Sequence, residues 1–277
     1  MTTISASVVN KLRQMTGAGM MDCKKALQEA NGDIDAAVDV LRKKGAAKAA
    51  KRADRDAAEG LAIALSSSDN TYGIAIEVNC ETDFVAKNDD FSKFANDLAA
   101  FALQNKFADR DALLASTFEG KVLSELLLEK TAVIGEKVDV SNYALVSSEG
   151  VAAYNHGANR IGVLVALNSN DEAALQAGRD LAMQIAAMNP IAVDEDAVSQ
   201  EVKDKELEIG RDIARQEGKP EAMLDKIAEG KLQRFYKDNT LMHQAFVKDS
   251  SMNVAAFLKS VNPSLKVKSF ARLQLGA

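Results

Sequence analysis

The chain has 277 residues, 47% of them hydrophobic, which is enough for two or three domains with cores of their own. Its 34 lysine and arginine residues face 40 acidic residues, and a net charge of −6 argues against a protein whose main task is to hold nucleic acid by its phosphates. No apolar run approaches a membrane span, no signal segment precedes Ser5, and Cys23 and Cys80 form no metal-type pair. We therefore expect a cytoplasmic protein with reduced thiols, no membrane partner and no bound metal.

Residues 1–45 are predicted to form a small domain of three helices. Ser5 or Ser7 caps the first, the second begins near Asp22, and Asp33 caps a third that Gly45 ends. Such a bundle buries only a modest core, and domains of this size commonly serve as docking modules. The apolar stripe expected for the first helix consists of Val8, Leu12 and Met15.

The loop between the first two predicted helices contains Gly17 and Gly19. Glycines ahead of a helix suggest a phosphate-binding loop, but the Gly-Lys-Ser/Thr ending and the preceding strand of that motif are missing. Met20 and Met21 are adjacent and cannot both face a small core. We therefore expect one of them at the surface, where methionine offers a soft contact to a protein partner.

Residues 42–55 are rich in alanine, lysine and arginine, with Asp54 as the single acidic residue. A basic run can bind nucleic acid, but no aromatic side chains are interleaved for base stacking. The composition therefore favours a solvated helical linker. We place the first domain boundary after this linker, at residue 56.

The body of the chain contains an internal repeat. Residues 73–79 and 162–168 both have the alternating branched pattern of a strand, at an offset of 89 residues. The helices that follow match at Asp97 and Asp180, at an offset of only 83 residues. The first copy thus has six additional residues between strand and helix, and Thr82–Val85 lies among them. Because the second copy makes the same turn without them, this insertion is a candidate protrusion for binding.

Phe84 is the unusual residue of the insertion, because a polar connection has no need of an aromatic side chain. It can point outwards as part of a binding surface, or it can pack back over Phe91 and close the core. Burial of a phenylalanine stabilises by roughly 1.5–3 kcal/mol, so energetics does not separate the two readings.

The remaining elements are predicted from hydrophobic patterns and from the three prolines, which fall at predicted breaks. Two charged amphipathic helices joined at Gly218–Pro220 predict an antiparallel hairpin at about 195–237, with an apolar seam that includes Ile209 and Ile213. We expect domains at 1–56, 57–148 and 149–277, the last with the hairpin inserted. The other predicted elements are a helix at 119–133, strands at 137–148, 150–155 and 160–167, a helix at 253–259 and a strand at 265–273.

Groups that could perform covalent chemistry do not converge in the sequence. The two histidines, His156 and His243, lie in different contexts, and no hydrolase, zinc-protease, dinucleotide or Cys-x-x-Cys motif is present. Cys80 continues the buried phase of the strand before it, which favours a structural thiol. The sequence therefore predicts no catalytic residues, no cofactor and no enzyme.

Several runs resemble signatures of the elongation factor Ts family, in that family's order and over essentially the whole chain. Thr16–Leu27 is similar to its N-terminal signature and Glu77–Lys87 to its second signature. Glu81 and Asn155 stand where some relatives have glutamine. Shorter matches are Ile134–Glu136, Tyr154–Gly157, Arg160–Val165 and Glu217–Pro220.

This resemblance implies an α+β fold. It comprises a three-helix, UBA-like N-terminal domain, a core of two related α+β subdomains with small antiparallel sheets, and an inserted helical hairpin that forms a coiled coil. It implies a guanine nucleotide exchange factor for elongation factor Tu, in its GDP-bound and nucleotide-free forms, with no direct nucleic acid. The resemblance leaves open whether the hairpin forms a homodimer or a 2:2 complex with the partner.

The resemblance also implies the site. In this family the segment Thr82, Asp83, Phe84 and Val85 enters the GTPase near its nucleotide and dislocates Mg²⁺. Other partner contacts carried over residue by residue are Leu12, Met20, Met21, Ile134, Gly135 and His156. Two alternatives stay open: an adaptor that binds the GTPase without exchange activity, and an enzyme with an unrecognised pocket.

Overall fold

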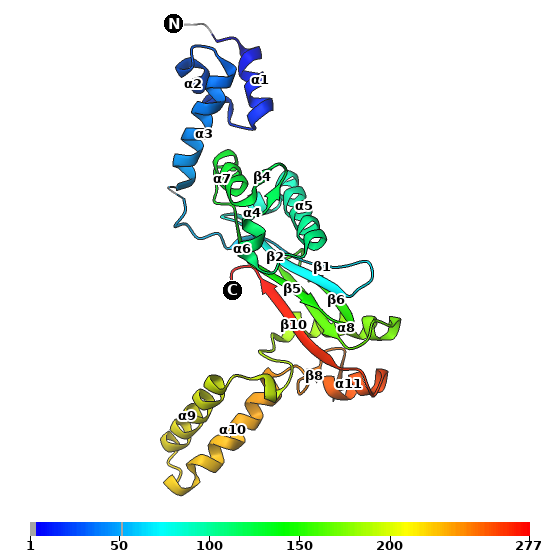
Figure 1. Ribbon diagram of the computed structural model, residues 1–277. Coiled ribbons are helices and arrows are strands. Elements are labelled where there is room, and N and C mark those ends of the chain that lie inside the picture. Colours follow the sequence, from blue (N-terminus) through cyan, green and yellow to red (C-terminus); the bar gives the residue numbers. More distant parts are fainter. Residues whose placement is uncertain (1–3, 51) are drawn as a thin grey trace. The chain divides into compact units, whose positions relative to one another are not determined.

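A computed structural model describes residues 4–50 and 52–277 of the chain (Figure 1). The chain divides into two compact units, and the turn of the first long hairpin, residues 64–75, belongs to the second unit together with residues 146–272. The first unit consists of Met1–Ile63, Ile76–Leu145 and Leu273–Ala277.

The N-terminal part of the first unit is a bundle of three helices, α1 (Ala6–Thr16), α2 (Met20–Glu29) and α3 (Ile34–Ala50). The predicted caps are confirmed: the Ser5 side chain accepts from the backbone N–H of Val8, and the Asp33 carboxylate accepts from Ala36, at 2.9 Å. The predicted stripe of α1 is only partly right, because Met15 is exposed and Val9 is buried in place of Val8. The buried residues of the bundle are Val9, Leu12, Cys23, Ala26, Leu27 and Ala37.

The prediction that Gly45 ends the third helix is wrong. Helix α3 continues through Gly45 to Ala50, and a Cβ atom at Gly45 would lie 2.7 Å from that of Ala132 on the later helix α7 (Leu123–Ile134). Glycine thus permits two helices to pack closely here instead of stopping one of them. The rest of the predicted linker is a turn at 52–54, and Lys51 lies outside the described residues.

The predicted repeat is confirmed as two copies of one topology. In each copy a hairpin of two strands is followed by a 17-residue helix, and a later strand pairs with the second strand of the hairpin. Both helices end at a residue with left-handed backbone conformation, Lys106 and Asn189. The first copy consists of β1 (Glu59–Ser66), β2 (Tyr72–Cys80), α5 (Asp89–Asn105) and β5 (Asp139–Ser147); the second consists of β6 (Gly150–His156), β7 (Ile161–Leu167), α8 (Glu172–Met188) and β10 (Val267–Gln274).

The helix predicted at 119–133 starts later than expected. Glu119 and Gly120 have positive φ values of 51° and 77° and form a tight turn, so the helix begins only at Leu123. Gly135 ends it in the left-handed conformation, with φ 82°. The elements before it are α6 (Arg110–Leu114), β3 (Thr117–Phe118) and β4 (Lys121–Val122).

The predicted hairpin consists of helices α9 (Gln200–Gln216) and α10 (Leu224–Asn239), drawn side by side in Figure 1. Its contacts are antiparallel, since Gly210 lies against Ala228 and Arg215 pairs with Glu221 across the turn at 3.1 Å. The buried residues of the two helices are Gly210 and Ala214 on α9 and Leu224, Ala228 and Tyr236 on α10, and the closest approach that a glycine permits is at Gly210 and Ala228. Ile209 and Ile213, which we predicted in the seam, are exposed. The short elements around the hairpin are η1 (Glu195–Ala197), η2 (Glu221–Met223), β8 (Ala245–Phe246), β9 (Asp249–Asn253) and α11 (Val254–Val261).

Candidate functional site

The connection between β2 and α5 forms an additional short helix, α4 (Asp83–Ala86). Thr82 is its N-cap, and the threonine side chain accepts from the backbone N–H of Val85. Phe84 points into solvent with 83% of its surface exposed, whereas Phe91 on α5 is buried. The structure therefore excludes the reading in which Phe84 packs back over Phe91.

Thr82 is also fixed from outside the connection. Its backbone N–H donates to one carboxylate oxygen of Glu136 at 2.9 Å, and its hydroxyl donates to the other oxygen at 2.7 Å. Glu136 follows Gly135, the residue that ends α7. Two segments about 50 residues apart in the sequence, Thr82–Val85 and Ile134–Gly135, are thereby brought together through one glutamate.

Glu81, the residue before this cap, accepts hydrogen bonds from three residues. One carboxylate oxygen accepts from Arg52 and from the backbone N–H of Lys137, each at 2.7 Å, and the other accepts from Arg55 at 3.1 Å. Partial burial acts to raise the pKa of Glu81, but the Lys137 N–H and the two guanidinium groups outweigh it and hold the pKa at about 2. Glu81 is therefore an anion at neutral pH.

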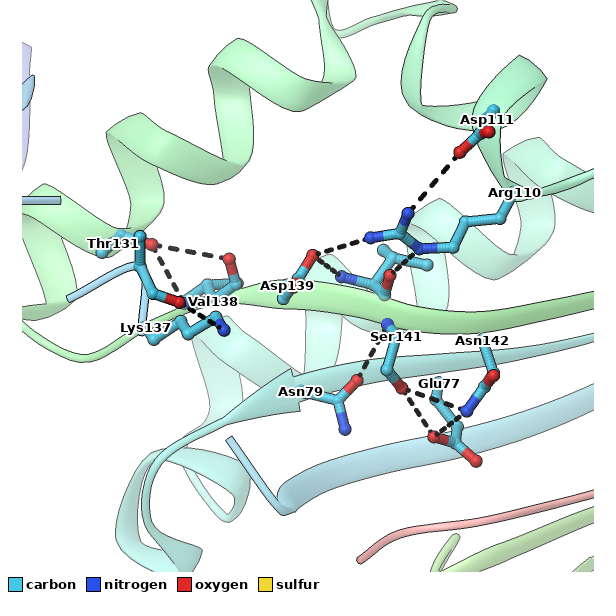
Figure 2. Close-up of polar contacts among 12 residues, drawn as sticks. Glu77, Asn79, Arg110, Asp111, Thr131, Lys137, Val138, Asp139, Ser141 and Asn142 are labelled. Carbon is cyan, nitrogen blue, oxygen red and sulfur yellow. Dashed lines mark hydrogen bonds and ion pairs between the residues drawn. The ribbon is translucent and has the colours of Figure 1, made fainter. Parts of the chain in front are cut away.

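The segment that follows Lys137 and leads into β5, residues 138–141, is held on both sides by polar groups (Figure 2). The Thr131 hydroxyl on α7 accepts from the N–H of Val138 at 2.9 Å, and the Arg110 guanidinium donates to the carbonyl of Val140. On the neighbouring strand β2, the Asn79 side chain accepts from Ser141 at 3.1 Å. The groups that hold Glu81 and Thr82 are thus part of a well-bonded segment.

Further along β5, Ser141 and Asn142 bind a buried carboxylate on β2. Glu77 on β2 is 4% exposed, and one of its oxygens accepts from the Ser141 hydroxyl at 2.6 Å and the Asn142 amide at 3.0 Å (Figure 2). A buried carboxylate is tolerated when hydrogen bonds satisfy it. This network therefore explains Glu77 as a residue that joins β2 to β5.

Asp83 is the second polar group that α4 presents. The Lys87 ammonium group donates to its carboxylate at 2.6 Å, and this interaction lowers the pKa of Asp83 below its usual value. Both side chains are largely exposed, and ion pairs of this kind are weak in water. The Asp83 carboxylate is therefore charged and can exchange its present partner for another cation or donor.

Cys80 lies directly below α4, and its thiol is fully buried. The sulfur donates to the carbonyl of Thr82 at 3.2 Å. Burial, with the nearby carboxylates of Glu136 and Glu59 adding to it, raises the pKa of the Cys80 thiol to about 12. The thiol stays protonated at neutral pH and is unreactive, which confirms the interpretation of Cys80 as a structural residue.

The predicted N-terminal contacts differ in exposure. Met20 and Met21 are 43% and 62% exposed, so both lie at the surface where we expected one. Leu12 is fully buried in the bundle, so its side chain supports the bundle and is not part of any surface. Within the first unit, a groove of about 490 Å³ lies between the bundle and α7, and its larger apolar lining residues are Met15, Val38, Leu41, Leu128 and Val133.

His156 is the predicted contact in the second unit. It is exposed at the end of β6, and its Nδ1 atom lies 3.0 Å from the Tyr154 hydroxyl. The adjacent Asn155 holds the neighbouring hairpin, since its amide side chain accepts from the N–H of Ala64 at 2.7 Å and donates to the carbonyl of Ala64 at 3.0 Å. Asn155 is thus a structural residue of the motif, to which we had assigned no role.

Sequence reasoning missed the residues that fix α4. Glu81 and Glu136 stood inside motifs without an assigned role, while Arg52, Arg55 and Lys137 stood in a linker and a strand. The only available signal was that acidic residues flank the predicted insertion while the preceding linker is basic. In the part of the chain that the structure describes, no three His, Cys, Asp or Glu side chains are grouped to hold a metal ion.

The arrangement defines a class of protein that acts by docking on another macromolecule. An exposed aromatic ring and an ionised carboxylate project from a short helix whose base is held by charge-assisted hydrogen bonds, and preorganised aromatic residues of this kind dominate binding energies at interfaces.

Among the described residues, no helix has both the length and the apolar character that a membrane crossing requires.

The chain belongs to the elongation factor Ts family. A family model described as "Elongation factor TS" matches residues 81–277. The proteins named elongation factor Ts from Christiangramia forsetii and Flavobacterium psychrophilum are 52% and 49% identical to it, each over the full length of both chains. The protein of that name from Chlorobaculum tepidum is 44% identical, also over the full length of both chains. The motif resemblance seen in the sequence is thus confirmed at the level of the family.

Proposed function

We propose that this protein is a translation elongation factor that binds elongation factor Tu in its GDP-bound form and promotes exchange of GDP for GTP. Membership in the elongation factor Ts family supports the partner and the activity. The observation that carries the residue-level proposal is Phe84, 83% exposed on a short helix with a fixed base. The protein makes and breaks no covalent bond in this role, which it performs in the cytoplasm.

The physical basis is competition for the groups that hold the nucleotide. A GTPase binds GDP through phosphate contacts that Mg²⁺ reinforces by neutralising charge. Phe84 enters between elements of the partner, and Asp83 competes for polar contacts around the magnesium ion. Loss of the cation leaves the phosphate charge uncompensated, so GDP dissociates faster.

Linkage sets a limit on this action. The factor weakens nucleotide binding by the same ratio by which nucleotide weakens binding of the factor. The protein therefore leaves the equilibrium between free GDP and GTP unchanged and shortens the time needed to reach it. The direction of exchange follows the concentrations of the two nucleotides.

Further contacts to the partner are proposed in each unit by itself. In the first unit these are Met20 and Met21, which are exposed, and Ile134 and Gly135, which precede the glutamate bound to Thr82. In the second unit it is His156. Leu12 contributes only by keeping the bundle folded, because its side chain is buried.

The test is release of fluorescent GDP from purified bacterial elongation factor Tu, measured by stopped flow with increasing amounts of factor. Phe84→Ala should slow the accelerated release by roughly 30-fold or more, since removing a central aromatic from an interface costs about 2 kcal/mol or more. Met188→Ala, which truncates an exposed apolar residue of the second copy, is the matched control and should behave as the unaltered protein.

Two results would count against the proposal. Release unchanged by Phe84→Ala would remove the role of the ring. Binding of the unaltered protein to elongation factor Tu without faster GDP release would favour the adaptor reading.

A further inference from the structure

We propose that Glu81 is a positioning residue that sets the orientation of α4, and with it Phe84, by joining the linker after α3 to the start of β5. This inference rests on the function proposed above and adds a residue to which the motif resemblance assigned no role. Glu81 itself does not touch the partner; it acts through Thr82 and α4.

The need for such a residue follows from the length of α4. A helix of four residues is too short to be stable alone, because nucleation fixes several dihedral angles for one hydrogen bond. No residue of α4 is fully buried, and Val85 and Ala86 are only partly covered, so the core alone holds it weakly. Its orientation therefore depends on the residues that precede it.

Glu81 is suited to this task by its surroundings. Its side chain is 13% exposed, and both carboxylate oxygens are used, by Arg52, Arg55 and the backbone of Lys137. Hydrogen bonds between ionised partners are shorter and stronger than those between neutral groups, and a shielded site weakens them less than open water does. Three segments of the first unit thus meet at one carboxylate.

The same segments are joined a second time. The Lys137 ammonium group donates to the linker carbonyls of Ala53 and Arg55, at 2.8 and 3.1 Å. Next to Lys137, Glu136 binds Thr82 through both carboxylate oxygens. The linker, the start of β5 and the base of α4 therefore form one bonded unit, with Glu81 and Thr82 as adjacent points of attachment.

A consequence concerns the three-helix bundle. The linker that Glu81 binds is the continuation of α3, so a displacement of the linker is transmitted to the residue before α4. The proposed role of Glu81 thus implies that docking of a partner on the bundle affects the presentation of Phe84.

The experiment compares Glu81→Gln with Glu149→Gln. Glutamine keeps the shape and can still accept from Lys137, but it loses the charge that binds the two arginines. Glu149 is the control because it too is an ionised carboxylate in an ion pair, with Lys268, and it has no contact with α4. Both variants are assayed for GDP release at increasing factor concentration and for hydrogen exchange at the amides of Val85 and Ala86.

We expect Glu81→Gln to lower the maximal acceleration of GDP release by roughly tenfold, the equivalent of one charge-assisted hydrogen bond. The half-saturating concentration should change less, because Met20, Met21 and the second unit still bind. Amide exchange at Val85 and Ala86 should accelerate by more than the fall in the unfolding temperature accounts for. Glu149→Gln should change none of these.

The double variant Arg52→Gln, Arg55→Gln leaves Glu81 in place and should reproduce the effect; combined with Glu81→Gln it should add little. Unchanged maximal release and amide exchange in Glu81→Gln would overturn the inference. Full additivity of the effects of Glu81→Gln and of the double arginine variant on GDP release would overturn it as well. If Phe84→Ala slows release while Glu81→Gln does not, the positioning role fails and the proposed function stands. If neither slows release, the role of the loop itself fails.

Discussion

The two copies of the repeat differ in how the chain passes from strand to helix. After β7, residues 168–171 suffice: the Ser169 hydroxyl donates to Asp171 at 2.6 Å, and Asp171 caps α8 by accepting from Ala174 at 2.8 Å. After β2, the connection covers residues 81–88 and contains α4, and Asn88 then caps α5. The helices that follow have the same length, 17 residues.

The difference shows what the fold requires and what it does not. Of the six additional residues in the first copy, two lengthen the strand, since β2 has nine residues and β7 has seven, and four lengthen the connection. None of the residues of α4 is buried. The additional turn is held by Glu136, Arg52 and Arg55, which lie outside it, so it is built to present side chains and not to complete the core.

The largest effect is expected when the first connection is made like the second. Replacing residues 79–88 by the Asn-Ser-Asn-Asp of the second copy should leave a folded protein, because α8 shows that this turn supports the same helix. The hydrogen bonds lost with α4 should lower the free energy of unfolding by about 2–4 kcal/mol, at roughly 0.5–1.5 kcal/mol for each bond. Acceleration of GDP release should disappear entirely in the stopped-flow assay, and retained acceleration would show that the turn is dispensable.

A smaller effect is expected from removing one cap in each copy. Thr82→Ala removes a cap and the hydroxyl bond to Glu136, and Asp171→Ala removes a cap and the bond from the Ser169 hydroxyl. Each should lower the free energy of unfolding in urea by about 1 kcal/mol. Only Thr82→Ala should slow GDP release; equal release rates for the two variants would remove the distinction between the connections.

Helix packing on the sheets offers a third comparison, at Ala95 in α5 and at the equivalent Gly178 in α8. A Cβ atom at Gly178 would lie 2.7 Å from that of Ala152 and 2.8 Å from Leu167, so α8 packs closer than a side chain allows. Gly178→Ala should destabilise by about 1–2 kcal/mol, because overpacking exceeds the gain in helix propensity. Thermal unfolding would measure this, and a stabilised variant would contradict the close packing. GDP release should be unaffected.

The smallest effect concerns the carboxylates of the two connections. Both Glu81 and Asp171 have a lowered pKa in the folded protein: for Glu81 the three donors outweigh the effect of burial, and for Asp171 the Ser169 hydroxyl is the main cause. When the pKa of a carboxyl group is lower in the folded than in the unfolded protein, ionisation of the group stabilises the folded state. This contribution is fully present at pH values above the pKa of the unfolded protein, and it is lost as the pH falls to the pKa of the folded protein. For Glu81 the loss should extend from about pH 4.5 to about pH 2.

Urea unfolding of Glu81→Gln and Asp171→Asn at several pH values checks this. Each variant should have a lower free energy of unfolding than the unaltered protein. This difference should be constant near neutral pH and become smaller in acid. Added salt should reduce the deficit of Glu81→Gln only, because arginines bind Glu81 whereas neutral donors bind Asp171. Equal salt dependence would argue that the arginines contribute nothing.

Local patterns predicted most of the fold. The caps at Ser5 and Asp33 and the repeat were confirmed because each depends on residues close in sequence. Gly45 was misread because a glycine near a helix end usually stops it, and its contact with Ala132 is not encoded nearby. The seam of the hairpin was misread for a related reason: Gly210 lets the helices approach, which leaves the larger Ile209 outside.

The site was predictable only in its exposed part. An aromatic in an insertion marked Phe84, but its orientation stayed open until α4 was seen to have no buried residue. The residues that hold α4 could not be found, because Glu136 lies 54 positions from Thr82 and Arg52 lies 29 positions before Glu81. Hydrogen bonds and ion pairs between residues so far apart leave no periodic signal in a single sequence.

The buried thiol below α4 gives this protein a built-in reporter. Because Cys80 is protonated and shielded, a thiol reagent can label it only while the turn above it is open. The rate of labelling thus reports how often the segment that carries Phe84 leaves its folded position, without an introduced cysteine.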